Sequence, residues 1–121
     1  MTIEEERRFL LLLSSYALGN HVTKAQVLDK IDDSGWIVLS DDDLKMKHNR
    51  KELVWRNNLA FVRKHLALAG LYQSELRDDW TITEKGVNAL VSLFQQAQVT
   101  PCSIITHKAI SDAKAILSSV L

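Results

Sequence analysis

The sequence predicts a mainly α-helical domain that carries one small β-hairpin. Three observations support this expectation. Apolar residues recur at helical spacing in several segments, capping-box signals precede most of them, and two short β-prone runs flank a polar turn. The chain has 121 residues, 46% hydrophobic and 25% charged, which is typical of one folded domain with a single core.

The longest amphipathic segment covers residues 49–71, and we expect the other elements to support it. Asn49 and Glu52 can form a capping box at its start, and Gly70 can supply the left-handed residue at its end. Helical spacing predicts an inward stripe of Trp55, Leu59, Val62, Leu66 and Ala69. It predicts an outer surface of Asn57, Ala60 and Lys64, flanked by Arg50, Arg56 and Arg63.

Two shorter helices precede this segment, and each begins with a capping-box pair. Thr2 with Glu5 predicts a helix to Leu18, and Thr23 with Gln26 predicts one to about residue 34. A tight turn at residues 19–20 separates them. Two helices joined in this way, followed by a long third helix, favour a helix-turn-helix arrangement.

Residues 35–48 are less regular. The apolar run at residues 36–39 fits either a strand or a buried loop. The acidic run after Ser40 suggests a metal cluster at first sight, but consecutive Asp side chains point in different directions, and no Glu follows at calcium-loop spacing. We therefore interpret Ser40 and Asp43 as the cap of a short helix over residues 41–47.

The remaining elements complete the predicted architecture. Residues 71–83 are expected to form the hairpin, with Leu71 and either Gln73 or Leu76 facing inward on one run and Trp80 and Ile82 on the other. Thr83 is expected to cap a helix that ends near Ala97. The order of elements predicts a winged helix-turn-helix domain over residues 1–97, a linker at 98–104, and a C-terminal amphipathic helix at 105–121.

The C-terminal helix bears on oligomeric state. Its apolar stripe must be covered, and packing on the first helix and pairing with a second copy both satisfy this requirement. We favour a homodimer, because two-fold proteins suit two-fold DNA sites. The stripe comprises Ile105, Ala109, Ala113, Ile116, Leu117 and Val120.

Charge is unevenly distributed along a chain whose net charge is zero. Residues 45–65 hold seven Lys or Arg against Glu52 alone, whereas residues 1–44 hold nine acids against four bases. Such a basic block fits either a solvated helix face or a local anion-binding surface.

Two motifs resemble a known family. Residues 55–66 read WRNNLAFVRKHL and are followed by Ala69-Gly70-Leu71; after a polar gap, residues 80–86 read WTITEKG. Over about residues 6–95 the chain resembles the N-terminal domain of Mrr-type restriction endonucleases. The resemblance implies a winged-helix DNA-binding module that is placed ahead of a nuclease domain.

The chain departs from such a nuclease because it lacks a second domain. Its one D-x-K sequence, residues 112–114, falls in an amphipathic helix with no strand pair or partner carboxylate, so we expect no catalytic site. The sequence leaves open whether the chain is part of a larger enzyme or a free-standing module. A nuclease domain or subunit is therefore a possible partner.

A recognition helix contacts duplex DNA mainly through its N-terminal half, and basic side chains bind the phosphates. Arg56 could read guanine and Asn57 adenine, while Lys45 and Lys47 would clamp phosphates. Arg63 is expected to be surface charge, and Arg77 to lie at the wing tip. The full candidate DNA-binding set is Lys45, Lys47, Arg50, Lys51, Arg56, Asn57, Lys64 and Arg77.

Other functions find little support. The four His and Cys102 show no metal-ligand spacing, so neither a metal nor a cofactor is expected. Trp55 and Trp80 are expected to be core residues rather than base-stacking platforms. A single Cys, no leader segment and no run of roughly 20 apolar residues fit a cytoplasmic location. A protein-interaction winged helix is the alternative function, and the neutral net charge favours it.

Overall fold

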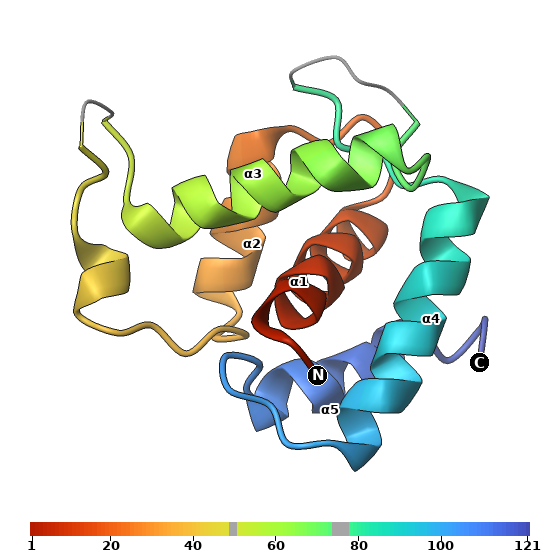
Figure 1. Cartoon of the computed structure of the whole chain (residues 1–121). Coiled ribbons are helices and arrows are strands. Elements are labelled where there is room, and N and C mark those ends of the chain that lie inside the picture. Colours follow the sequence, from red (N-terminus) through yellow and green to blue (C-terminus); the bar gives the residue numbers. More distant parts are fainter. Residues whose placement is uncertain (49–50, 74–77) are drawn as a thin grey trace.

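The computed structural model describes residues 1–48, 51–73 and 78–121 (Figure 1). Within these ranges it is mainly helical, with almost no β-structure, which confirms the predicted class at this level. None of the helices described has the length and apolar character needed to cross a bilayer. The elements are α1 (Ile3–Leu18), α2 (Lys24–Asp33), the 3₁₀ turn η1 (Asp42–Leu44), α3 (Val54–Leu68), α4 (Glu84–Val99) and α5 (His107–Ile116).

The first helix, α1, lies at the centre of the fold. The other long helices α2, α3 and α4 all pack against it, and α5 packs against α4 (Figure 1). All residues from Phe9 to Ser15 are buried, so α1 is enclosed on every side rather than along one stripe. Its two buried hydroxyls have partners: Ser14 donates to the Val27 carbonyl at 2.9 Å, and Ser15 lies 2.9 Å from the Tyr72 hydroxyl. The centre is therefore α1, and not the 49–71 segment that we expected.

Local capping signals locate most helix starts. Both predicted capping boxes, at Thr2 and at Thr23, are present, and α1 and α2 span the expected residues. Thr83 and Thr106 cap α4 and α5 through their hydroxyls. Helix ends agree less well, because α5 ends at Ile116 rather than near residue 120.

The predicted helix over residues 41–47 is reduced to the single turn η1. Ser40 and Asp43 exchange backbone-to-side-chain hydrogen bonds of 2.8 and 3.2 Å, as their spacing predicted. The chain leaves the helical conformation at Lys45, whose backbone is extended and whose carbonyl accepts from the Val54 N–H at 2.8 Å. Pairing with the start of α3 therefore ends the turn.

The start of α3 is at Val54, several residues later than predicted. Residues 45–47 pair with residues 52–54 instead: Met46 bridges Leu53, and the Lys47 N–H donates to the Glu52 carbonyl at 2.7 Å. The Glu52 carboxylate pairs with Lys24 of α2 at 2.7 Å and does not cap a helix. Asn49, the predicted cap, lies outside the described residues.

The end of α3 follows the prediction. Gly70 has a φ of 81°, and the Leu71 N–H donates back to the Leu66 carbonyl at 2.9 Å, which is the Schellman arrangement. Trp55, Leu59, Val62 and Leu66 are buried as expected. Ala69 is exposed, because the helix has already ended at Leu68.

The predicted hairpin is not confirmed. Among the described residues its two runs share one isolated bridge, Tyr72 to Ile82, supported by a 2.8 Å bond from the Gln73 N–H to the Thr81 carbonyl. Trp80 is buried, as predicted, and its N–H donates to the Val22 carbonyl at 2.8 Å. Leu76 lies outside the described residues.

A buried carboxylate ties α1 to the segment before α5. Glu6 is 0% exposed, and its Oε1 accepts hydrogen bonds of 2.8–3.1 Å from the backbone N–H groups of residues 103–105. Ile105 also bridges Ile37, so residues 36–39 form a partly buried loop with a single bridge rather than a strand. Nearby, burial raises the pKa of the Cys102 thiol, and the negative charge of Glu6 raises it further.

The apolar stripe near the C-terminus is largely covered within one chain. Ile105, Ala109, Ala113 and Leu117 are buried, and α5 lies against α4. Ile116 is partly buried, while Val120 is exposed beyond the end of α5. The homodimer stays a prediction, but most of the stripe is already buried within one chain.

Candidate nucleic-acid interface

The basic block occupies the turn before α3 and the outer surface of α3. Lys45, Lys47 and Lys51 are exposed on the paired turn of residues 45–54. Lys45 forms an ion pair with Asp42 at 2.8 Å, in which both side chains are highly exposed. Such exposed pairs contribute little energy and can open to admit a phosphate. Arg50 lies outside the described residues.

Arg56 faces α2 rather than the outside. Its guanidinium lies 2.9 Å from the Asp29 carboxylate and 3.6 Å from that of Asp32, and 4.9 Å from the centre of the Trp55 ring. These contacts hold the side chain against the surface and partly neutralise it. The predicted guanine reader therefore has three partners within the fold.

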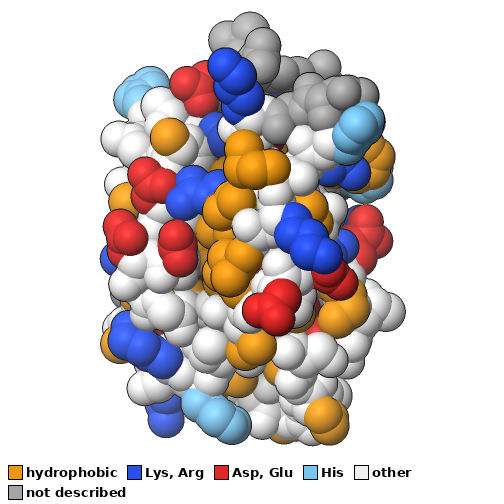
Figure 2. Space-filling view, turned by 90° about the vertical axis from the view of Figure 1, so that its left-hand side faces the viewer, with side chains coloured by type: hydrophobic (Ala, Val, Ile, Leu, Met, Phe, Trp, Pro, Cys, Tyr) orange, Lys and Arg blue, Asp and Glu red, His pale blue; other side chains and the backbone are white. Residues whose placement is uncertain are grey.

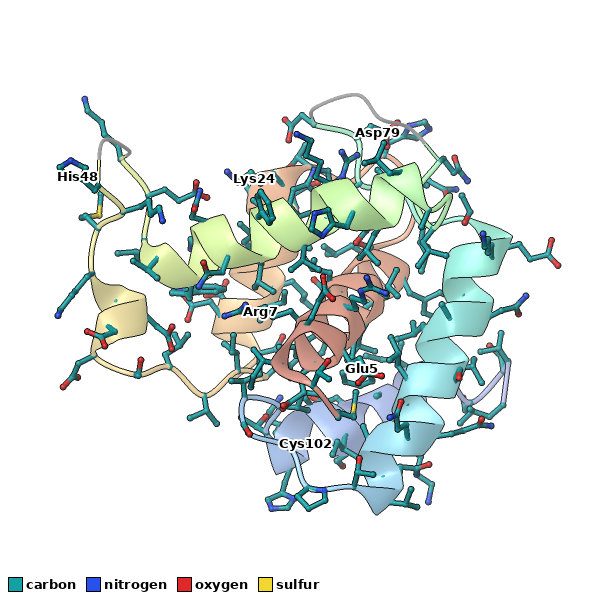
Figure 3. The ribbon with its side chains drawn as sticks, viewed as in Figure 1. Glu5, Arg7, Lys24, His48, Asp79 and Cys102 are labelled. Carbon is teal, nitrogen blue, oxygen red and sulfur yellow. The ribbon has the colours of Figure 1, made fainter. Side chains whose placement is uncertain are left out.

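The environment of Arg63 differs most from the prediction. We expected an exposed surface charge, but the side chain is buried. Its guanidinium donates to the Asp79 carbonyl at 2.6 Å and lies 5.5 Å from the ring centres of both Tyr72 and Trp80. Burial raises the pKa of Tyr72, although the Ser15 hydrogen bond and the Arg63 charge oppose the shift. Arg63 thus fastens α3 to the segment that carries Asp79 (labelled in Figure 3).

The outward face of α3 carries Asn57, Phe61, Lys64 and Leu68. They lie at intervals of four, three and four residues and therefore share one side of the helix. Phe61 is 62% exposed and Leu68 67% exposed; Lys64 is also exposed, and Asn57 is half-buried. This face keeps Asn57 and Lys64 of the expected surface, but it presents Phe61 rather than Ala60, and Arg56 and Arg63 face α2 and the buried side instead of flanking it.

A groove of about 310 Å³ lies beside this face, toward the first turns of α1. His65 lines one part of the groove. Its Nδ1 lies 3.4 Å from the Glu4 carboxylate, and its ring is edge-on to the Phe61 ring, with 4.9 Å between the two ring centres. Arg7, labelled in Figure 3, adds a cation from α1. The groove is lined by Glu4, Arg7, Lys47, Asn57, Asn58, Phe61, Val62 and His65.

A second face combines apolar and charged side chains. Figure 2 looks onto the side that carries the segment before α3, and hydrophobic side chains run along its middle between groups of both signs. The exposed apolar residues of this segment are Val38, Leu44 and Met46. We did not predict this surface from the sequence. The apolar residues that stand among the acids and lysines of 36–48 could have indicated it.

The D-x-K sequence has a structural role. The Asp112 carboxylate accepts from Lys108 at 2.7 Å and from the Trp36 indole at 2.8 Å. These hydrogen bonds, first that of Lys108 and then that of Trp36, lower the pKa of Asp112. Within the described ranges, no three His, Cys, Asp or Glu side chains are grouped as metal ligands would be.

Most of the predicted residues that the structure describes lie on or beside α3. Lys45, Lys47, Lys51, Asn57 and Lys64 lie on the turn before α3 or on its outer side, and Arg56 turns toward α2. Arg77 lies outside the described residues. The arrangement defines a small helical domain with a partly basic outer surface, which is typical of a binding module.

Comparison with protein families gives one match, to the Mrr N-terminal domain, over residues 6–92. The chain belongs to this family, as residues 55–66 and 80–86 suggested. Neither the comparison with curated proteins nor that with solved structures gave a match. Family membership links the chain to the N-terminal domains of Mrr-type restriction systems.

Proposed function

We propose that the chain is a winged-helix module that binds duplex DNA through the turn before α3 and the outward face of α3, without nuclease chemistry of its own. The observation that carries the proposal is the group of exposed cations Lys47, Lys51 and Lys64 around the N-terminal half and outer side of α3. Membership in the Mrr N-terminal domain family supports it. A nuclease domain or subunit, fused or associated, would then act on the bound DNA.

The winged-helix part of the proposal rests on the order of elements. α2 and α3 follow α1 as a helix-turn-helix would, and the paired residues 71–73 and 81–83 lead from α3 into α4. In such a domain α3 enters the major groove and the segment after it touches the backbone. Arg77 would lie on that segment.

The test is fluorescence anisotropy of a labelled duplex between about 50 and 200 mM salt. The variant Lys47→Ala/Lys64→Ala should bind more weakly, and its log–log salt slope should fall by about 1 for each phosphate that a lysine no longer neutralises. The control Lys85→Ala/Lys114→Ala removes two exposed lysines on α4 and α5 and should bind as the wild type does. Equal weakening in both variants, or no binding at 50 mM salt, would refute the proposal.

A protein-interaction module is the second candidate. The observation in its favour is the mixed face of Figure 2, where Val38, Leu44 and Met46 are each more than half exposed. The pairing of Arg56 with Asp29 and Asp32 also lowers the positive charge near α3. Failure of DNA binding in the anisotropy experiment would leave this face as the surface to test.

A further inference from the structure

The contacts of the two arginines in α3 limit which base pairs this helix would recognise. Both of its arginines have partners within the chain: Arg56 pairs with Asp29 and Asp32 at the partly exposed surface toward α2, and Arg63 is buried and donates to the Asp79 carbonyl. Arginine that forms two hydrogen bonds to guanine is the commonest specific contact in the major groove. These partners compete with guanine for both guanidinium groups.

The side chains left on the outward face are of a different kind. Asn57 lies in the N-terminal half of α3, the part that reaches base edges in helix-turn-helix proteins, and Phe61 lies one turn further along, at the middle of the helix. Lys64 and Leu68 lie one and two turns further along the same side. An Asn amide matches the N6 and N7 edge of adenine, and a Phe ring makes apolar contact with the thymine methyl group.

Phe61 is exposed to solvent and is supported by a neighbouring ring. Its ring is 62% exposed, and the edge-to-face contact with His65 supports it from the α1 side. Lys47 and Arg7 line the same groove as Phe61 and Asn57, where their charges suit phosphates on the flank of a groove-bound helix. The groove beside the ring thus contains two cations, Lys47 and Arg7, together with the acidic Glu4.

We propose that the outward face of α3 reads A·T base pairs, with Asn57 on adenine and Phe61 on the thymine methyl group. This inference rests on the proposed DNA-binding function. Phe61 is a residue that the sequence analysis did not select, and the inference replaces Arg56 as the source of base specificity.

The first experiment is selection of bound duplexes from a pool with a randomised central segment, followed by sequencing. The wild type should enrich A·T pairs at defined positions. Phe61→Ala should keep its salt-dependent binding but lose the preference for thymine, and Asn57→Ala should lose that for adenine. Val99→Ala is the control, since it removes an exposed apolar side chain at the end of α4, outside the proposed binding face.

The second experiment replaces thymine by uracil in the best duplex, which removes only the methyl group. For the wild type and for Val99→Ala, affinity should fall about fourfold at the contacted position, as expected for one buried methyl group. Phe61→Ala should bind both duplexes equally.

The outcomes separate the two proposals. Salt-dependent binding that enriches G·C pairs, or that is unchanged by uracil, would refute the A·T inference and leave the DNA-binding function standing. Binding of no duplex at low salt would refute the function itself, and the inference with it.

Discussion

Arg63 and Lys64 are neighbours in the sequence but have opposite environments. Lys64 is exposed, whereas Arg63 is buried over Tyr72 and Trp80. Helical spacing places residue 63 beside the buried stripe, but spacing alone cannot say whether a neighbouring segment covers it. Tyr72, Asp79 and Trp80 provide the contacts that cover Arg63, so this burial could not be predicted from the helix itself.

Removal of Arg63 should therefore destabilise the domain. Arg63→Ala leaves the Asp79 carbonyl without its guanidinium donor and empties the space between two rings, so we expect the free energy of unfolding to fall by about 2–4 kcal/mol. Lys64→Ala should change it by less than about 0.5 kcal/mol. Urea unfolding followed by circular dichroism measures both. Equal values for the two variants would contradict the burial of Arg63.

Tyr72 makes the stability sensitive to alkaline pH. Its pKa is raised in the folded state by burial, so the unfolded state loses this proton first, from about pH 10. Because the folded state then holds more protons than the unfolded state, stability should fall as the pH rises above that value. Tyrosinate absorbance should show that Tyr72 titrates only on unfolding.

The variant Tyr72→Phe assigns this step. It should remove the part of the tyrosinate signal that Tyr72 contributes when the protein unfolds at high pH. A Tyr72 signal that already appears in the folded wild type near the pKa of a free tyrosine would show that Tyr72 is not enclosed.

At the scale of the elements, α4 is fitted closely to the segments before it. A Cβ added to Gly86 would collide with the Leu71 carbonyl oxygen and the Ile82 side chain. The glycine thus lets the first turn of α4 approach the pair of runs that join it to α3. Its position three residues after Thr83 was part of the motif that identified the family.

Gly86→Ala should therefore destabilise the domain, although alanine is the better helix former. We expect a loss of about 1–3 kcal/mol from overpacking, against a gain in helix propensity of about 1 kcal/mol at most. Asn88→Ala, an exposed position in the same helix, should be neutral or slightly stabilising. Thermal unfolding of both variants checks this, and a higher melting temperature for Gly86→Ala would contradict the close approach.

Helix starts were predictable where a local signal sets them. The hydroxyls of Thr2, Thr23, Thr83 and Thr106 each cap a helix, and the cap lies within three residues of its partner. The start of α3 was not predictable in this way. It depends on the pairing of Met46 with Leu53 and on an ion pair between Glu52 and Lys24, which are contacts between distant residues.

For the molecule as a whole, the region matched by the family does not include every part of the core. The match ends at residue 92, but Ala109, Ala113 and Leu117 are buried in the same core. Asp112 also supplies the hydrogen-bond acceptor of the Trp36 indole. Residues beyond the family match therefore contribute to stability.

A chain shortened after Gln98 should lose its cooperative unfolding transition. Shortening removes all three backbone donors of the buried Glu6 carboxylate, and it uncovers the apolar side of α4. A buried charge that is left without compensation costs about 3–5 kcal/mol. A chain shortened only after Leu117 should retain most of its stability, because residues 118–121 are exposed. Calorimetry distinguishes the two, and equal transitions would show that α5 is dispensable.

The candidate site was predictable as a region but not in detail. The excess of Lys and Arg over residues 45–65 located the basic surface, because charge is a property of the sequence. Which cations remain available depends on α2 and on residues 72–80, since these hold Arg56 and Arg63. The exposure of Phe61 followed from the same helical spacing and could have been recognised.

The contact between Glu6 and residues 103–105 has a consequence for biosynthesis. During translation α1 leaves the ribosome first, while the amides that receive its carboxylate emerge almost a hundred residues later. Until then α1, the most fully buried of the described helices, has no complete enclosure, and contacts between such distant residues form slowly. We therefore expect the domain to close only after nearly all of it has been synthesised, with α1 as a site for chaperones in the interval.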